Sequence, residues 1–212
     1  MTEGARRYGG QDAAERTAER RARLVAAGID LMGERGLAAT TVRGVAEASG
    51  LAARYFYESF AGIEDLQVAV FDAIAAEAAE RAIAALATAP DDPPARIRAV
   101  LAEMVDLFLE DPRKGRIVLT DSVASPVLGP RVLRESSRFA GMVAATASSG
   151  DPVGAVEDLP VELRLTAQFL IGGVAHAIGA VLRGDVVAER DRLVEVLVGR
   201  FVEVVEGGGF TT

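Results

Sequence analysis

The stretch TVRGVAEASGLAARYFYESFAGIEDL, residues 41–66, decides the fold. Thr41 stands directly before the apolar-periodic segment 42–49, where its hydroxyl is suited to cap a helix by accepting from an exposed backbone N–H. Gly50 ends this segment, and residues 51–60 form a second short apolar-periodic unit. Two short helices joined by a tight glycine-containing turn are typical of a helix-turn-helix, so the second helix is expected in the major groove of DNA.

Outside this stretch the chain has helical periodicity almost throughout. Apolar residues recur at spacings of three and four, and alternating β-branched or aromatic runs are nearly absent. The pattern predicts helices over about 16–35, 63–86, 97–111, 113–123, 133–147, 161–183 and 188–206. We therefore expect an all-α protein with a flexible tail over 1–15, a helix-turn-helix domain over 16–62, a larger helical domain over 63–206 and a second flexible tail over 207–212.

The composition excludes several kinds of site. The 212 residues contain no cysteine and one histidine, His176. The sequence therefore excludes disulfides, thiolate metal ligands, a thiol nucleophile and a multi-histidine zinc site, and no metal site is expected. Residues 1–15 lack the apolar run of a secretory signal, so a cytoplasmic location is expected.

The net charge of −8 argues at first against nucleic acid, because phosphate contacts require Lys and Arg. The charge is unevenly divided, however. Residues 1–66 carry 9 cations and 10 anions, whereas residues 67–212 carry 14 cations and 21 anions. The acidity therefore belongs mainly to the second part, where it discourages non-specific DNA contact, and any DNA contact is expected on a small face of the first part.

One segment, residues 165–182, has the length of a short membrane span. It contains no charged residue, and its length of eighteen residues is at the lower limit for crossing a bilayer. It also contains Gln168, His176 and several small residues, and the following segment 188–206 again has one apolar face between charged residues. A buried or subunit-interface helix is the better interpretation, and two such helices from each of two subunits would form a four-helix homodimer interface rather than contact a membrane.

The motifs in residues 24–66 together resemble the TetR family of transcriptional regulators. The shared features are a helix that begins at Thr41, the Gly50-Leu51 turn, the Phe56-Tyr57-x-x-Phe60 element and the acidic pair before Leu66. The resemblance implies an N-terminal three-helix DNA-binding domain followed by a larger helical domain for effector binding and dimerisation. It also implies a dimeric repressor that a small-molecule effector releases from a palindromic DNA operator.

The resemblance and the helix-turn-helix pattern select candidate DNA contacts. Thr41 is expected to contact a phosphate at a helix N-terminus, and Arg43 a phosphate or a base edge. Arg54 is the first candidate for reading guanine N7 and O6, and Ala53 or Tyr55 for contacting a thymine methyl. The full set of expected DNA-binding residues is Thr41, Arg43, Ala52, Ala53, Arg54, Tyr55 and Tyr57, of which Tyr57 matches a family phosphate contact.

Three positions depart from the family pattern. Ala52 stands where a Ser or Thr commonly caps the recognition helix, Ile63 replaces a lysine, and Ser59 replaces a frequent His or Tyr. Since each lost phosphate contact lowers affinity and its salt dependence, we expect modest affinity per half-site and a reliance on dimeric binding.

In the second part, polar or adaptable residues interrupt apolar faces at helical spacing. An effector cavity with few polar groups favours an apolar or amphipathic ligand, although such residues are more often plain core. Candidate ligand contacts are Met104, Phe108, Thr120, Phe139, Met142 and Gln168. Candidate dimer contacts are Phe169, Gly172, Gly173, His176, Ala180, Leu193, Leu197 and Phe201.

Two other functions remain open from the sequence. An enzyme is disfavoured because no nucleophile elbow, phosphate-binding glycine loop or His-Glu-x-x-His motif is present, so neither catalysis nor a cofactor is expected. The alternative is a helical ligand-binding or oligomeric module whose DNA binding is weakened or lost, which Ala52, Ser59 and Ile63 make conceivable.

Overall fold

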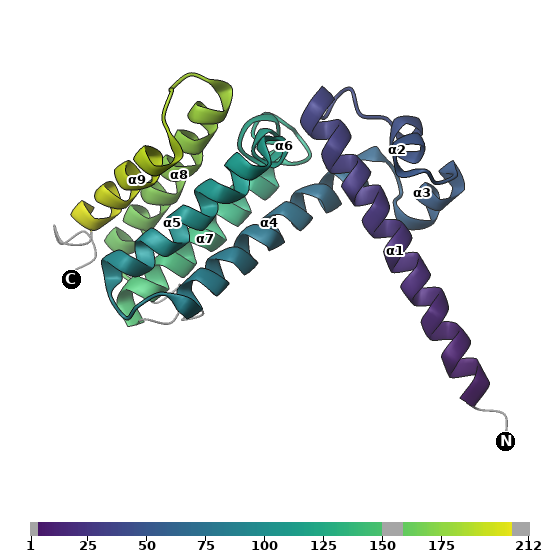
Figure 1. Ribbon diagram of the computed structural model, residues 1–212, viewed down its shortest axis with the longest axis horizontal. Coiled ribbons are helices and arrows are strands. Elements are labelled where there is room, and N and C mark those ends of the chain that lie inside the picture. Colours follow the sequence, from purple (N-terminus) through teal and green to yellow (C-terminus); the bar gives the residue numbers. More distant parts are fainter. Residues whose placement is uncertain (1–3, 150–158, 205–212) are drawn as a thin grey trace. The chain divides into compact units, whose positions relative to one another are not determined.

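The computed structural model describes residues 4–149 and 159–204, and within these ranges every regular element is helical (Figure 1). The elements are α1 (Gly4–Arg35), α2 (Val42–Ser49), α3 (Ala53–Ser59), α4 (Ile63–Thr88), α5 (Pro93–Glu110), α6 (Pro112–Gly115), η1 (Arg116–Asp121), α7 (Gly129–Ser149), α8 (Val161–Arg183) and α9 (Arg190–Val204). The all-α prediction is confirmed. The expected tail over 207–212 lies outside the described residues.

The first helix is longer than the sequence predicts. The sequence predicts a helix that begins at about residue 16, but α1 begins at Gly4, so the predicted start is wrong. The segment 11–20 is rich in Ala, Glu, Gln and Arg, which favour helix, and an established helix extends at little cost over such residues. The other end is where the sequence places it, because Gly36 follows α1 with a φ of 87°.

The chain forms two compact units, Met1–Ala73 and Ile74–Thr212. The division falls within α4, so the first turns of this helix belong with α1, α2 and α3 rather than with the larger unit. In the first unit, a Cβ added at Gly28 of α1 would lie 2.8 Å from Val70 Cγ2 of α4. Glycine therefore allows α1 and α4 to approach closely, and the core between the helices consists of Leu24, Met32, Val45, Phe56, Leu66 and Val70, each completely buried.

In the second unit α5 packs on α9, and α7 packs on α8 (Figure 1). The region predicted as one helix over 113–123 is a short α6 followed by the π-helix η1. The wider turn is visible at its end, where Ser122 N donates to Ile117 O at 3.0 Å. A Cβ added at Gly115 would collide with the Leu182 side chain, so α6 and α8 are in close contact.

Ion pairs bind the second half of α4 to α5 and α6. Lys114 Nζ lies 2.7 Å and 2.8 Å from the two carboxylate oxygens of Glu77. Arg81 Nη1 donates to Glu110 Oε2 at 3.0 Å, and this bond raises the pKa of Arg81. The two links fix the part of α4 that belongs to the second unit.

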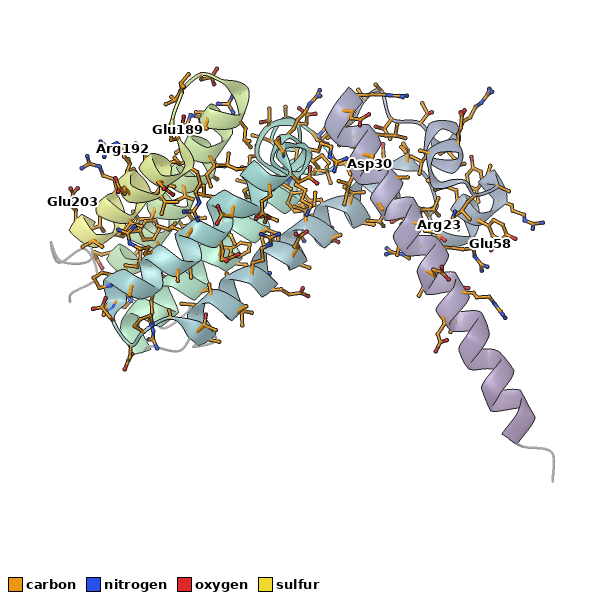
Figure 2. All side chains as sticks on the ribbon, viewed as in Figure 1. Arg23, Asp30, Glu58, Glu189, Arg192 and Glu203 are labelled. Atoms are coloured by element: carbon orange, nitrogen blue, oxygen red, sulfur yellow. The ribbon has the colours of Figure 1, made fainter. Side chains whose placement is uncertain are left out.

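A bidentate ion pair joins the start of α9 to α5. Arg190 Nε and Nη2 donate to the two Asp106 oxygens at 2.7 Å and 2.6 Å, and Arg190 Nη1 also donates to Asp191. The Arg190 hydrogen bonds hold the pKa of Asp106 below its usual value. Beyond this pair, Arg192 and Glu203 project outward from α9 (Figure 2).

The Asp106 pair predicts a pH-dependent contribution to stability. A carboxyl whose pKa is lowered in the folded state contributes stability above its unfolded pKa, 3.8, and loses it as the pH falls through the folded pKa. Asp106→Asn should therefore cost about 1 kcal/mol near neutral pH, and the cost should shrink as the pH is lowered below about 4. Urea unfolding of both proteins between about pH 6 and pH 3 measures this. The control is Asp191→Asn, which leaves the Asp106 pair in place, and a pH-independent cost for Asp106→Asn would contradict the assignment.

The helix α8 is long and apolar enough to span a membrane, and 28% of its most apolar window is buried within the chain. It packs mainly against α7, with further contacts to η1, α6, α5 and α9. Its exposed side includes Phe169, which is 76% exposed, but also the polar residues Gln168 and His176.

Candidate nucleic-acid interface

The start of α2 is a capped helix N-terminus. Thr41 is the N-cap in extended backbone conformation, and its hydroxyl oxygen accepts from Gly44 N at 3.2 Å, as the sequence predicts. The hydroxyl proton remains available to donate. Arg43 is exposed in the first turn, so a phosphate placed here would meet free backbone N–H groups, a hydroxyl and a guanidinium.

The turn between α2 and α3 is fixed by α1. Gly50 caps α2 with a φ of 66°, in the left-handed region that favours glycine. Arg23 of α1 donates from Nη2 to Ser49 O at 2.6 Å, and a Cβ added at Gly50 would lie 3.3 Å from the same Nη2 (Figure 2). The bond satisfies a carbonyl at the end of α2 and sets the angle at which α3 leaves the turn.

The exposed start of α3 presents one positioned cation. Ala52 is the N-cap and provides no side-chain hydrogen bond, as its chemistry requires. Arg54 Nη2 donates to the Tyr55 hydroxyl at 2.7 Å, and its guanidinium carbon lies 4.6 Å from the centre of the Tyr55 ring. This hydrogen bond raises the pKa of Arg54. The structure thus brings the predicted Arg54 and Tyr55 together, with Tyr55 half-buried and Arg54 exposed.

A second arginine, not predicted from the sequence, lies at this place. Arg20 of α1 lies over the same Tyr55 ring, with its guanidinium carbon 4.8 Å from the ring centre. It also lies 3.9 Å from Glu58 Oε2 of α3, which Figure 2 labels. No motif links positions so distant in the sequence, and only the packing of α1 on α3 brings them together.

The inner side of α3 is aromatic. Phe56 is completely buried, and its ring centre lies 5.5 Å from that of Phe60 and 5.6 Å from that of Tyr57. Arg21 of α1 lies over the Phe60 ring at 4.9 Å. Tyr57 is 63% exposed, which leaves its hydroxyl accessible to a phosphate. Phe56 and Phe60 therefore hold α3 while Arg54 and Tyr57 face outward.

The predicted effector residues come from neighbouring helices of the second unit. They are Met104 and Phe108 of α5, Thr120 of η1, Phe139 and Met142 of α7, and Gln168 of α8. Phe108 is buried and lies beside Gly115, so it is part of the packing of α5 on α6. Gln168 lies on the exposed side of α8 and belongs with the exposed residues there rather than with the interior. Met104, Thr120, Phe139 and Met142 are half-buried.

The predicted dimer residues separate into two groups. Phe169, Gly172, Gly173 and His176 form an exposed stripe on α8, and a Cβ added at either glycine would meet nothing within 4 Å. Ala180 is half-buried further along the helix. The α9 residues differ, because Leu193, Leu197 and Phe201 are buried within the chain at 5–7% exposure. The prediction that these three meet a partner is therefore wrong, since α5 already occupies the side of α9 that they form, and Val196 is the exposed apolar residue of α9.

A family model supports the interpretation of the first unit. Residues 24–70 match the model of bacterial regulatory proteins of the tetR family. This range includes α2, α3, the turn between them and the first turns of α4. A search of curated proteins found no match.

Solved structures share the fold over nearly the whole chain. The fatty acid degradation regulator FadR from Bacillus halodurans is 15% identical, with a TM-score of 0.71 over 89% of this chain and 95% of its own. A tetR-family transcriptional regulator from Streptomyces coelicolor is 19% identical, with a TM-score of 0.71 over 91% and 82%. FadR from Bacillus subtilis, solved in complex with stearoyl-CoA, is 17% identical, with a TM-score of 0.67 over 88% and 97%. At these identities the likeness establishes the fold alone.

Proposed function

We propose that this chain, whose residues 24–70 match the tetR family model, is a dimeric, cytoplasmic repressor of transcription that a small apolar or amphipathic effector releases from a palindromic operator. The observation that carries the proposal is the outward-facing group on α2 and α3. Thr41, Arg43, Arg54 and Tyr57 are all exposed there, on helices whose angle is fixed by a buried aromatic core. This arrangement is typical of a recognition helix that binds in the major groove, with phosphate contacts on either side of it.

Dimerisation is supported by the exposed stripe on α8. An apolar side chain as large as Phe169 at 76% exposure, followed by Gly172 and Gly173, offers a surface on which a second helix can approach closely. Two copies of the chain would each contribute α8 and the outer side of α9 to one interface. A dimer also offsets the modest affinity expected of each half-site.

The effector class is supported by the composition of the second unit. Among the described residues of this unit, those that are fully buried are mainly Ala, Leu, Val, Ile and Phe, and Ser122 is the polar exception. FadR from Bacillus subtilis holds an amphipathic molecule, stearoyl-CoA, in the same fold. We propose that effector binding favours a dimer arrangement whose recognition helices no longer fit successive major grooves.

The experiment is a gel shift of the full chain on the DNA that flanks its own gene, repeated across salt concentrations. Specific retention that weakens steeply with salt supports the regulator. No retention even at low salt would contradict it and favour the alternative, a helical module that has lost DNA binding.

Arg54→Ala should weaken specific binding by about 1–3 kcal/mol and relax the preference at one base pair, because the variant removes the donors to guanine. Arg43→Ala is the matched control, since loss of a phosphate contact should weaken binding to all sequences alike and lower the salt slope by about one. Titration of both variants against the operator and its single-base variants makes the measurement. Unchanged operator binding by Arg54→Ala would contradict the assignment.

A further inference from the structure

The base-reading candidate is held in place before DNA arrives. An exposed arginine on a short helix normally samples many rotamers, and ordering it on binding has an entropic cost. Arg54 instead donates to the Tyr55 hydroxyl at 2.7 Å and lies over the Tyr55 ring. A charge-assisted hydrogen bond and a cation–π contact thus act on the same guanidinium.

The Tyr55 ring that Arg54 contacts is itself held in place by neighbouring residues. Tyr55 is half-buried, and Arg20 of α1 lies over its ring at 4.8 Å. Arg20 also lies 3.9 Å from Glu58, one turn further along α3. Since the α3 N-cap is an alanine without a side-chain hydrogen bond, this contact from α1 supports the first turn of the recognition helix.

We propose that Tyr55 is a positioning residue for Arg54, supported by Arg20, and that it sharpens the reading of one base pair without contacting a base itself. This inference rests on the proposed function. A guanidinium has five N–H donors, and the bond to Tyr55 uses one of them. Enough donors remain for the two-bond contact to guanine O6 and N7. This role differs from the one that the sequence suggests for Tyr55, which is apolar contact with a thymine methyl.

The test is a double-mutant cycle with the full chain: wild type, Tyr55→Phe, Arg54→Ala and the double variant. Tyr55→Phe removes only the hydroxyl and keeps the ring on which Arg20 rests, so the fold should persist, as circular dichroism and thermal unfolding would show. Each protein is titrated against the operator and all its single-base variants at two salt concentrations.

The positioning role predicts that Tyr55→Phe reduces discrimination about threefold, the scale of one exposed charge-assisted hydrogen bond, at the base pair that Arg54→Ala also affects. It predicts an unchanged salt slope and no further effect of Tyr55→Phe in the Arg54→Ala protein. An equal effect in both backgrounds, or an effect at another base pair, would mean that Tyr55 contacts DNA directly and would overturn the inference alone. A wild-type protein that prefers no sequence would overturn the proposed function and this inference together.

Discussion

Replacing Phe169 with aspartate is expected to convert the proposed dimer into a monomer. Phe169 is 76% exposed at the start of the α8 stripe, so in a dimer it would be buried against the partner, and a carboxylate there would be desolvated without a matching cation. Two linked half-site contacts bind about 10²–10⁴ times more tightly than one. Operator affinity should therefore fall by about that factor, although Phe169 is distant in sequence from the DNA-binding helices.

Sedimentation or native mass spectrometry measures the oligomeric state, and the gel shift measures the affinity. The matched control is Leu133→Asp, an equally drastic change at a residue of α7 that is 72% exposed but lies outside the α8 stripe. It should leave both quantities nearly unchanged. A Phe169→Asp protein that remained dimeric would show that α8 does not form the interface.

Phe56→Ala is expected to have the largest effect on folding. The side chain is completely buried at the centre of the first unit and contacts the Phe60 ring, so its truncation leaves a cavity. Such changes cost about 3–5 kcal/mol, a large part of the stability of a small domain. Specific DNA binding should be lost, because α3 would no longer be held at a fixed angle.

Urea unfolding should locate this loss in the first unit. Since the chain has two compact units, we expect the transition of Met1–Ala73 to shift to lower urea while that of Ile74–Thr212 remains in place. Tyr57→Ala is the control, because this neighbouring ring is 63% exposed and its loss should cost little stability. Equal destabilisation by both variants would contradict the packing described here.

The sequence predicted the parts of the fold that depend on local chemistry. Thr41 caps α2 and Gly50 adopts a left-handed conformation, as their residue types require. The bounds of α8, at Val161 and Arg183, were also predicted, since a polar Gly- and Pro-containing connector precedes it and a glycine follows. Each of these features is decided by residues within one or two turns of each other.

The sequence did not predict features that depend on tertiary contact. The π-helix η1 has the same apolar spacing as an α-helix, so periodicity does not distinguish them. Leu193 lies on an apolar face of α9, and the sequence pattern does not indicate whether α5 or a second chain covers that face. The contact of Arg20 with Tyr55 joins two helices that are distant in the sequence, and this contact adds a supporting layer to the candidate site.

The central claim is that two copies of α3 read a palindrome. Selection of bound duplexes from a random DNA pool by the full-length protein tests it most directly. The account predicts enrichment of an inverted repeat whose half-site centres are about one helical turn, or a multiple of it, apart, with a guanine whose enrichment disappears in Arg54→Ala. The claim would be contradicted if the DNA selected by the wild-type protein showed no enriched sequence, or only a single unrepeated half-site.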